Sequence, residues 1–406
     1  MREPFAKRLG LIPPYLFQEL DDLKAQTRGN VIDLCEGNPD QPPSRAVQRA
    51  LIRSLGRTAS HRYPTYAGKL SARQAAADWY RRRFGVKLDP TSEAVMLLGS
   101  KEGIAHLIWG VCGPGDRIAV ADPVFPMYMN QTRLCGARLV TVPLLEKNRF
   151  LPDLEYLERI GPKIKLLCLN YPNNPTAAVA DSEFYRDLVR LARRFGFYIA
   201  NDCVYSELYF GRAKPPSVLQ VPGAKECSIE FHSLSKTFSM AGWRIGVAVG
   251  NARLVSALLK IKQNTDSGPF SAIQDAAAYA LDNAESLSRK TRSLYRERRD
   301  VFCDELARHG WTVPRPEATF YVWVKVPGRG HDRIVRQSGP YPKPTEPSPD
   351  FRFVLDMLRE CKVVAAPGSG FGRYGRGYVR FALVQDEKKL RTAARRIGRW
   401  LKRRTV

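Results

Sequence analysis

The stretch "SIEFHSLSKTFSMAGWRIGVAVG", residues 228–250, places one lysine between two strand-like runs, SIEFHSL and IGVAVG. Lys236 follows the first run and stands among serines, apolar residues and glycines. A lysine at the end of a buried strand can lose its hydration, which lowers the pKa of the ammonium and makes the amine a usable nucleophile. The stretch therefore predicts a reactive lysine at the edge of a sheet.

The neighbours of Lys236 add a second chemical signal. Most lysines only extend to solvent, so the lysine alone would carry little weight. Ser233, Ser235 and Arg244 can each bind a phosphate, and the arginine can do so as a bidentate fork. A lysine that can form a Schiff base beside a phosphate cradle is what pyridoxal 5'-phosphate (PLP) requires.

Strand-like runs continue along the chain from about residue 92, in alternation with helix-like segments. The runs before the lysine are VMLLG (95–99), RIAVAD (117–122), RLVTVPL (138–144), KLLCLN (165–170) and FYIAND (197–202). Several are nearly continuous apolar runs, which is typical of strands covered on both faces. The alternation predicts a wound α/β sheet whose ligands bind at the carboxyl ends of the strands.

Polar residues stand at the ends of two of these predicted strands. Asp202 ends FYIAND, with Tyr205 three residues later, and Asn174 lies in LNYPNNPT (169–176). PLP needs an acid near its pyridine nitrogen and donors to its ring hydroxyl. Each residue alone has an ordinary explanation as a cap, a packed ring or a turn. Their convergence with Lys236 on one crevice favours a PLP site.

Four sequence blocks, "NYPNNPT", "NDCVYSE", "HSLSKTFSMAGWRIG" and "RFAL", resemble the fold-type I, class I/II PLP-dependent aminotransferases. The resemblance covers residues 10 to 400 approximately. It implies a three-layer fold with a wound, mostly parallel sheet and a smaller α+β domain. It also implies an N-terminal arm with part of the small domain over 1–45, a large PLP-binding domain over 46–290 and a small domain over 291–406.

The resemblance assigns roles around the cofactor ring. Lys236 corresponds to the lysine that forms the Schiff base and then moves the proton between two carbons. Asp202 corresponds to the partner of the pyridine nitrogen, and Asn174 and Tyr205 correspond to the residues that bond the ring oxygen. Phe125, in DPVFPMY, matches the aromatic residue that stacks on the pyridine ring, although ordinary core packing would also explain it.

The resemblance also assigns the phosphate ligands. Ser100 and Lys101, in LGSKEG, would bind the phosphate together with Ser233 and Arg244. The helix expected over 101–112 begins here, and its first backbone N–H groups suit an anion.

For the substrate, Arg380 in YVRFAL matches the arginine that holds the α-carboxylate, with Asn174 beside it. Gly37, in CEGNPD, would approach the same carboxylate through its backbone. Tyr63, in HRYPTYAG, matches a tyrosine that reaches the phosphate of the neighbouring subunit. This correspondence implies a homodimer with shared sites.

The chain departs from the family pattern in two places. The family usually has NNPTG, whereas Ala177 follows the threonine here. Cys203 follows the predicted cofactor aspartate and Asn201 precedes it. Neither departure removes a predicted ligand.

Within the family, the segments "RYPTYAGKLSARQAAADWY", "LGSKEGIAHL" and "IKQNTDSGPF" are most similar to LL-diaminopimelate aminotransferases. This implies a ping-pong exchange between LL-diaminopimelate and 2-oxoglutarate, on the lysine and peptidoglycan route. An aspartate, alanine or aromatic aminotransferase, or a PLP-dependent C–S lyase, stays open as an alternative. The "GRGHDRIVRQSGPYPKPTEPSPD" loop (328–350) is interpreted as an insertion, with a lid as the alternative.

Composition narrows the remaining classes of function. The chain has 406 residues and a net charge of +25, concentrated in part at 81–83 and 395–406. We interpret these basic runs as solvated helix faces, because no stacking aromatics alternate with them and no helix-turn-helix precedes the fold. A nucleic-acid partner is therefore not expected.

The sequence also disfavours a metal-binding protein, a membrane protein and a secreted protein. The eight scattered cysteines form no CxxC pair, which favours reduced thiols in the cytoplasm and disfavours a metal site. An apolar run long enough to cross a membrane is absent, and the N-terminus does not resemble a signal peptide.

Overall fold

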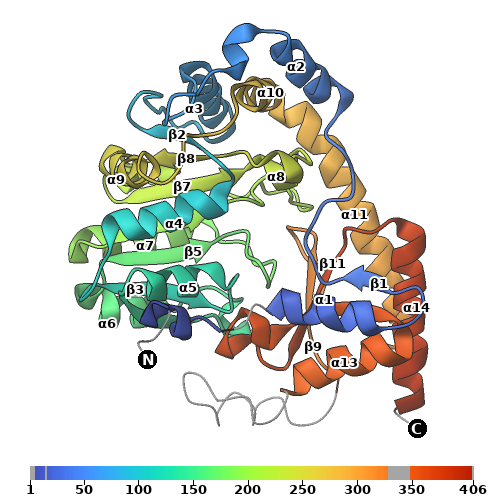
Figure 1. Cartoon of the computed structure of the whole chain (residues 1–406). Coiled ribbons are helices and arrows are strands. Elements are labelled where there is room, and N and C mark those ends of the chain that lie inside the picture. The colour runs from blue at the N-terminus through green and yellow to red at the C-terminus, as the bar shows by residue number, and fades with distance from the viewer. Residues whose placement is uncertain (1–4, 14–15, 328–347, 405–406) are drawn as a thin grey trace.

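The computed structural model describes residues 5–13, 16–327 and 348–404, which form two sheets with helices around each (Figure 1). The larger sheet has seven strands in the order β2-β8-β7-β6-β5-β3-β4. Their bounds are β2 Ala94–Leu97, β3 Arg117–Asp122, β4 Arg138–Pro143, β5 Leu166–Asn170, β6 Tyr198–Asp202, β7 Ser228–Ser233 and β8 Gly246–Gly250. Every strand-like run of the sequence is confirmed as a strand of this sheet.

Helices cover both faces of the large sheet, which gives the expected three layers (Figure 1). One face is covered by α4 (Ser100–Val111), α5 (Met127–Leu134) and α9 (Ala252–Lys262). The other is covered by α3 (Leu70–Phe84), α6 (Leu154–Ile160) and α7 (Ser182–Phe195), while α10 (Ser271–Asp282) packs against α3, and α2 (Arg45–Leu55) packs against α10. Burial from both sides explains why these strands are apolar along their whole length.

Strand β8 runs antiparallel to both of its neighbours, β7 and β2, while the other strands are parallel to one another. A parallel crossover needs a dozen or more residues, usually with a full helix. Between β7 and β8 the chain forms only the four-residue helix α8 (Leu234–Thr237) and a short 3₁₀ turn. The chain therefore turns back on itself and holds Lys236 at the edge of the sheet.

The smaller sheet has the order β1-β10-β11-β9, with β1 parallel to β10 and the other pairs antiparallel. Its strands are β1 Ile32–Leu34, β9 Tyr321–Lys325, β10 Val363–Pro367 and β11 Tyr378–Ala382. Its helices are α1 (Leu16–Gln26), α11 (Ala284–Arg308), α13 (Pro349–Cys361) and α14 (Glu387–Arg404). This α+β arrangement is the small domain that the sequence predicts, and it includes the N-terminal strand β1.

Helix α11 links the two domains, because Ala284 belongs to the core of the large domain and Tyr295 to that of the small one. The expected limit at residue 290 falls between them, and we propose to keep the division at 1–45, 46–290 and 291–406. Most of the 328–350 loop lies outside the described residues.

Helix α14 carries the basic C-terminal run. Its buried side chains form an apolar stripe, Leu390, Ala393, Ala394, Ile397, Gly398 and Trp400. Arg391 and Arg395 reach Glu305 on α11, and Arg404 pairs with Asp356 on α13.

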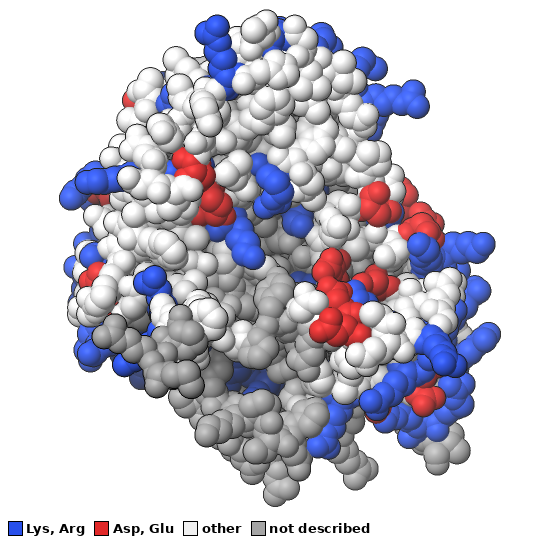
Figure 2. Space-filling view, viewed as in Figure 1, with Lys and Arg blue, Asp and Glu red and all other residues white. Residues whose placement is uncertain are grey.

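Figure 2 shows basic side chains over much of the visible outline and a hollow between the two sheets. None of the helices in the described ranges is long and apolar enough to span a lipid bilayer.

Candidate active site

A cavity of about 500 Å³ lies between the two sheets, at the carboxyl ends of the parallel strands. Eleven of the twelve predicted site residues line it: Gly37, Ser100, Lys101, Phe125, Asn174, Asp202, Tyr205, Ser233, Lys236, Arg244 and Arg380. Tyr63 does not, and its side chain is 91% exposed on this single chain. The structure thus brings together residues that are up to 343 positions apart, from Gly37 to Arg380.

Lys236 lies on α8, directly after the buried strand β7. Its Nζ donates a hydrogen bond to the carbonyl oxygen of Gly37 at 2.6 Å. The pKa of Lys236 is lowered to about 8, first by burial and then by the nearby positive charges of Arg380 and Arg244, against smaller opposing effects of the acids. The amine is therefore much closer to its nucleophilic, neutral form at physiological pH than an exposed lysine would be.

Asp202 ends strand β6 and is buried. Burial raises the pKa of this carboxyl to about 7, and the hydrogen bond that Tyr128 donates to its Oδ2 opposes the rise. Its Oδ1 is buried without a hydrogen-bond partner among the described residues. A buried carboxylate oxygen without a hydrogen-bond partner destabilises the folded protein. A ligand that brings a donor or a positive charge to Oδ1 would remove this penalty.

An anion-binding corner lies where helix α4 begins. Gly99 adopts φ +88°, and a Cβ there would lie 2.6 Å from Nη2 of Arg244. Gly246 allows a second close approach, because its Cβ would lie 3.0 Å from the backbone nitrogen of Ser100. Two glycines thus let the guanidinium and the helix N-terminus face one cavity wall with Ser233. Together they provide a positive charge, N–H groups and a hydroxyl for one anion.

Arg380 reaches the cavity from strand β11 of the small domain and is only 1% exposed. Its Nη1 donates to Oδ1 of Asn174 at 2.7 Å, and its Nη2 donates to the carbonyl oxygen of Cys35 at 2.5 Å. Its guanidinium carbon lies 4.2 Å from the centre of the Tyr321 ring and 4.6 Å from that of Phe371. This stacking fixes the plane of the fork, which suits the recognition of a carboxylate.

Three residues of the site have no motif in the sequence that predicts them. Tyr128 bonds Asp202, and the hydroxyl of Tyr321 lies 2.9 Å from that of Tyr205. Asn170 joins two neighbouring strand ends, because its Nδ2 donates to the carbonyl oxygen of Asp202 and its Oδ1 accepts from the backbone of Asn174, each at 2.7 Å. Tyr128 stands in DPVFPMY and Tyr321 in TFYVWVKV, but each contact crosses between distant elements, so spacing alone gave no signal.

Gly37 has a steric reason to be glycine. A Cβ on it would lie 2.0 Å from the hydroxyl oxygen of Tyr321, far inside van der Waals contact. The absence of a side chain lets the Gly37 carbonyl approach Lys236.

The family model for class I and II aminotransferases matches residues 29–397 of this chain. An LL-diaminopimelate aminotransferase of Aquifex aeolicus is 45% identical, over 97% of this chain and 98% of the relative. An enzyme of the same name from Nitratidesulfovibrio vulgaris strain Hildenborough is 44% identical over the same shares.

Solved structures agree with the fold. Substrate-bound BacF from Bacillus subtilis superposes with a TM-score of 0.88 at 31% identity, over 98% of each chain. A probable N-succinyldiaminopimelate aminotransferase from Thermus thermophilus gives 0.84 at 33% identity, over 95% of this chain and 99% of that one. The chain therefore belongs to the class I and II aminotransferases.

Proposed function

We propose that this aminotransferase binds PLP and exchanges an amino group between LL-diaminopimelate and 2-oxoglutarate in a ping-pong cycle. The products are glutamate and an amino-oxo acid, which closes to tetrahydrodipicolinate with loss of water. The names of the full-length relatives support this substrate pair. The observation that carries the cofactor assignment is the buried, unpartnered Oδ1 of Asp202 in the same cavity as Lys236, whose pKa is lowered to about 8.

The cavity offers one partner for each polar part of PLP. Arg244, Ser100, Lys101 and Ser233 would hold the phosphate, and Phe125 would stack on the ring. The carboxyl of Asp202 would pair with the pyridine nitrogen, whose positive charge would lower the raised pKa of that acid again. Asn174 and Tyr205 would bond the ring oxygen, and Lys236 would hold the cofactor covalently.

When bound, PLP supplies an electron sink that stabilises negative charge at Cα of the amino acid attached to it. Lys236 then acts as the base, because its neutral Nζ can take the proton from Cα and return it elsewhere. Arg380 binds the α-carboxylate through its fixed fork and sets the direction of the Cα–H bond. Its burial between two rings excludes water from that contact.

Glu36 supports a substrate with a second amino group. The cofactor and the α-carboxylate would use the other charged side chains of the lining, Lys101, Asp202, Lys236, Arg244 and Arg380. Glu36 also lines the cavity, and its carboxylate forms no ion pair within the parts of the chain that the structure describes. The negative charge of the Glu36 carboxylate, which the cofactor and the α-carboxylate would not use, suits the distal ammonium of a diamino acid.

A matched comparison of amino donors tests this assignment. Glu36→Gln should lower kcat/KM for LL-diaminopimelate by about 3- to 5-fold, as expected for one exposed charged contact, while kcat/KM for glutamate stays unchanged. Equal losses for both donors would reject the role of Glu36. Turnover of cystathionine to pyruvate and ammonia without an oxo acid would instead identify a C–S lyase.

We also propose a homodimer in which Tyr63 completes the partner's phosphate site. Tyr63 is 91% exposed, and other large apolar side chains are exposed near it in the sequence, namely Ile52, Leu55, Tyr66 and Leu70. Exposed large apolar side chains in one segment of the chain are what a subunit interface would cover. The eight cysteines form no disulfide within the chain, which supports a cytoplasmic location.

A further inference from the structure

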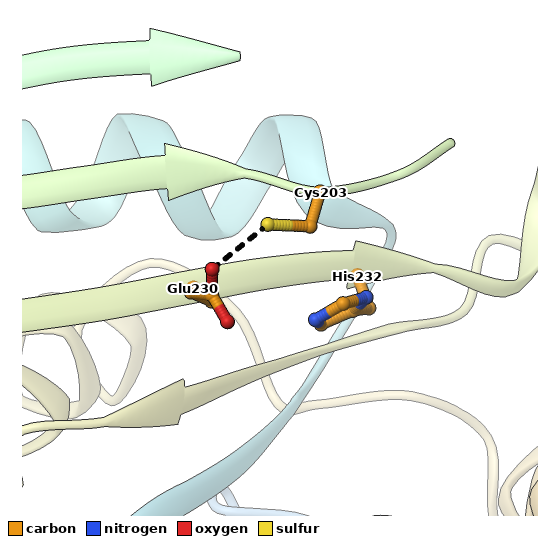
Figure 3. A group of neighbouring side chains, drawn as sticks. All are labelled: Cys203, Glu230 and His232. Carbon is orange, nitrogen blue, oxygen red and sulfur yellow. Dashed lines mark hydrogen bonds between the residues drawn. The ribbon is translucent and has the colours of Figure 1, made fainter. Parts of the chain in front are cut away.

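A buried polar cluster lies beneath Asp202, on the face of the large sheet away from the cavity. Figure 3 shows three of its members, Cys203, Glu230 and His232, beside one another. Side chains alternate along a strand, so Asp202 faces the cavity while Asn201 and Cys203 face the opposite side. The cluster therefore contacts the strand end on both sides of the cofactor acid.

Glu230, on strand β7, is the centre of this cluster and is fully buried. Its carboxylate has no Lys, Arg or His partner within 4.0 Å among the residues with described side chains. It accepts hydrogen bonds instead: from Asn201 Nδ2 at 3.0 Å, Cys203 Sγ at 3.1 Å, Val218 N at 3.0 Å, Tyr80 Oη at 2.9 Å and the hydroxyl of Ser217. Five donors balance the buried charge.

The hydrogen bonds also explain why the cluster is not arranged as a metal site. The hydroxyl of Tyr80 lies between Glu230 and His232 and bonds both. Burial lowers the pKa of His232 to about 3, so the imidazole is neutral. Since Tyr80 donates its only proton to Glu230, His232 donates its Nε2–H to Tyr80. The donor atoms are therefore already used by one another.

Two of the five donors belong to the residues that flank Asp202. Asn201 and Cys203 both bond Oε1 of Glu230, and the backbone of Cys203 also donates to the carbonyl oxygen of Phe231 at 2.8 Å. The strand end that presents Asp202 is thus fastened to β7 immediately before and after the acid.

We propose that Glu230 is a positioning residue, which holds Asp202 against the pyridine nitrogen of PLP by clamping Asn201 and Cys203 from the opposite face of the sheet. This rests on the proposed binding of PLP at Asp202. The positioning role of Glu230 would explain why Asn201 and Cys203 stand on either side of the aspartate.

Two single substitutions separate positioning from simple stabilisation. Cys203→Ala removes a donor to Glu230 on the strand that carries Asp202, whereas Ser217→Ala removes a donor to the same carboxylate on a remote 3₁₀ turn. Both variants lose buried hydrogen bonds, since Ser217 Oγ also accepts from Leu219 N and Cys203 Sγ also accepts from Asn201 Nδ2, so both should melt at a lower temperature. Cys203→Ser keeps a donor and serves as the conservative control.

The readout is the pH at which the absorbance band of the lysine-bound cofactor changes, with the Kd for PLP measured alongside. A displaced Asp202 would let the pyridine nitrogen lose its proton, and the loss of that positive charge raises the midpoint by about 0.5–1 pH unit. We expect this rise, and about tenfold weaker PLP binding, in Cys203→Ala. We expect no shift in Ser217→Ala and a partial return in Cys203→Ser.

Two results would overturn the proposal. An unchanged midpoint in Cys203→Ala, or the same shift in Ser217→Ala, would leave Glu230 a structural role only. If the unmodified protein forms no such band with added PLP, the proposed cofactor assignment itself fails and the positioning role fails with it.

Discussion

At the scale of single residues, burial of Lys236 and Asp202 disfavours the charged form of each side chain in the folded protein. The pKa of Lys236 is lowered to about 8 and that of Asp202 is raised to about 7, and burial is the first cause of both shifts. Each shift means that the folded state disfavours the charged form. A site that must bind a charged cofactor is therefore less stable when it is empty.

Removal of the buried amine should stabilise the protein without its cofactor. Because the pKa of Lys236 falls from 10.5 to about 8 on folding, the unfolded state binds more protons between these values and stability rises with pH across this window. Lys236→Met should therefore raise the free energy of unfolding by about 2 kcal/mol at pH 7, after the lost bond to Gly37 is allowed for.

The measurement is urea unfolding of the PLP-free protein at several pH values. The gain from Lys236→Met should shrink as the pH approaches 10.5. A gain that does not depend on pH would mean that better packing, not the removed charge, stabilises the variant. The same variant should have no transaminase activity.

At the scale of elements, the strand ends could be predicted and the tertiary partners could not. Apolar runs that stop at Asp202 and before Asn174 placed both residues at one sheet edge, since parallel strands share their carboxyl ends. The pattern carries no information on strand direction, so the antiparallel β8 was not foreseen. Nor did it reveal Tyr321, whose hydroxyl meets Tyr205 from the other domain.

The turn after strand β5 contains a departure from the family pattern that the structure explains. Ala177 adopts φ +61°, a left-handed conformation in which a Cβ is strained. The family glycine would adopt it freely. Ala177→Gly should therefore stabilise the protein by about 0.5–1 kcal/mol, after the greater entropy of glycine in the unfolded chain is counted.

Ala178→Gly is the matched control for this prediction. Ala178 follows directly and is not among the residues with positive φ, so the same change should destabilise by about 0.5–1 kcal/mol. Chemical denaturation of both variants gives the comparison. Destabilisation by both would show that the left-handed turn costs nothing here.

At the scale of the whole molecule, the cavity depends on both domains. Gly37 and Arg380 come from the small domain, and Lys236 and Asp202 come from the large one. Eleven of the predicted residues meet in one chain, whereas Tyr63 lies outside the cavity. Sequence could indicate its role only through the family resemblance, because a contact across subunits leaves no trace in the pattern of one chain.

The proposed dimer makes a specific prediction for Tyr63. Tyr63→Phe should keep the dimer but weaken PLP binding by about 5- to 20-fold, through the loss of one hydrogen bond to a charged phosphate. Light scattering gives the oligomeric state and fluorescence titration gives the Kd. A monomer in solution, or an unchanged Kd, would contradict the shared site.

The covalent link between cofactor and chain tests the central claim most directly. The holoenzyme, formed with added PLP, is reduced with sodium borohydride and digested, and the peptides are identified by mass spectrometry. We predict a single modified peptide that carries the reduced cofactor on Lys236. Attachment to any other lysine, or no attached cofactor, would contradict the assignment of this site.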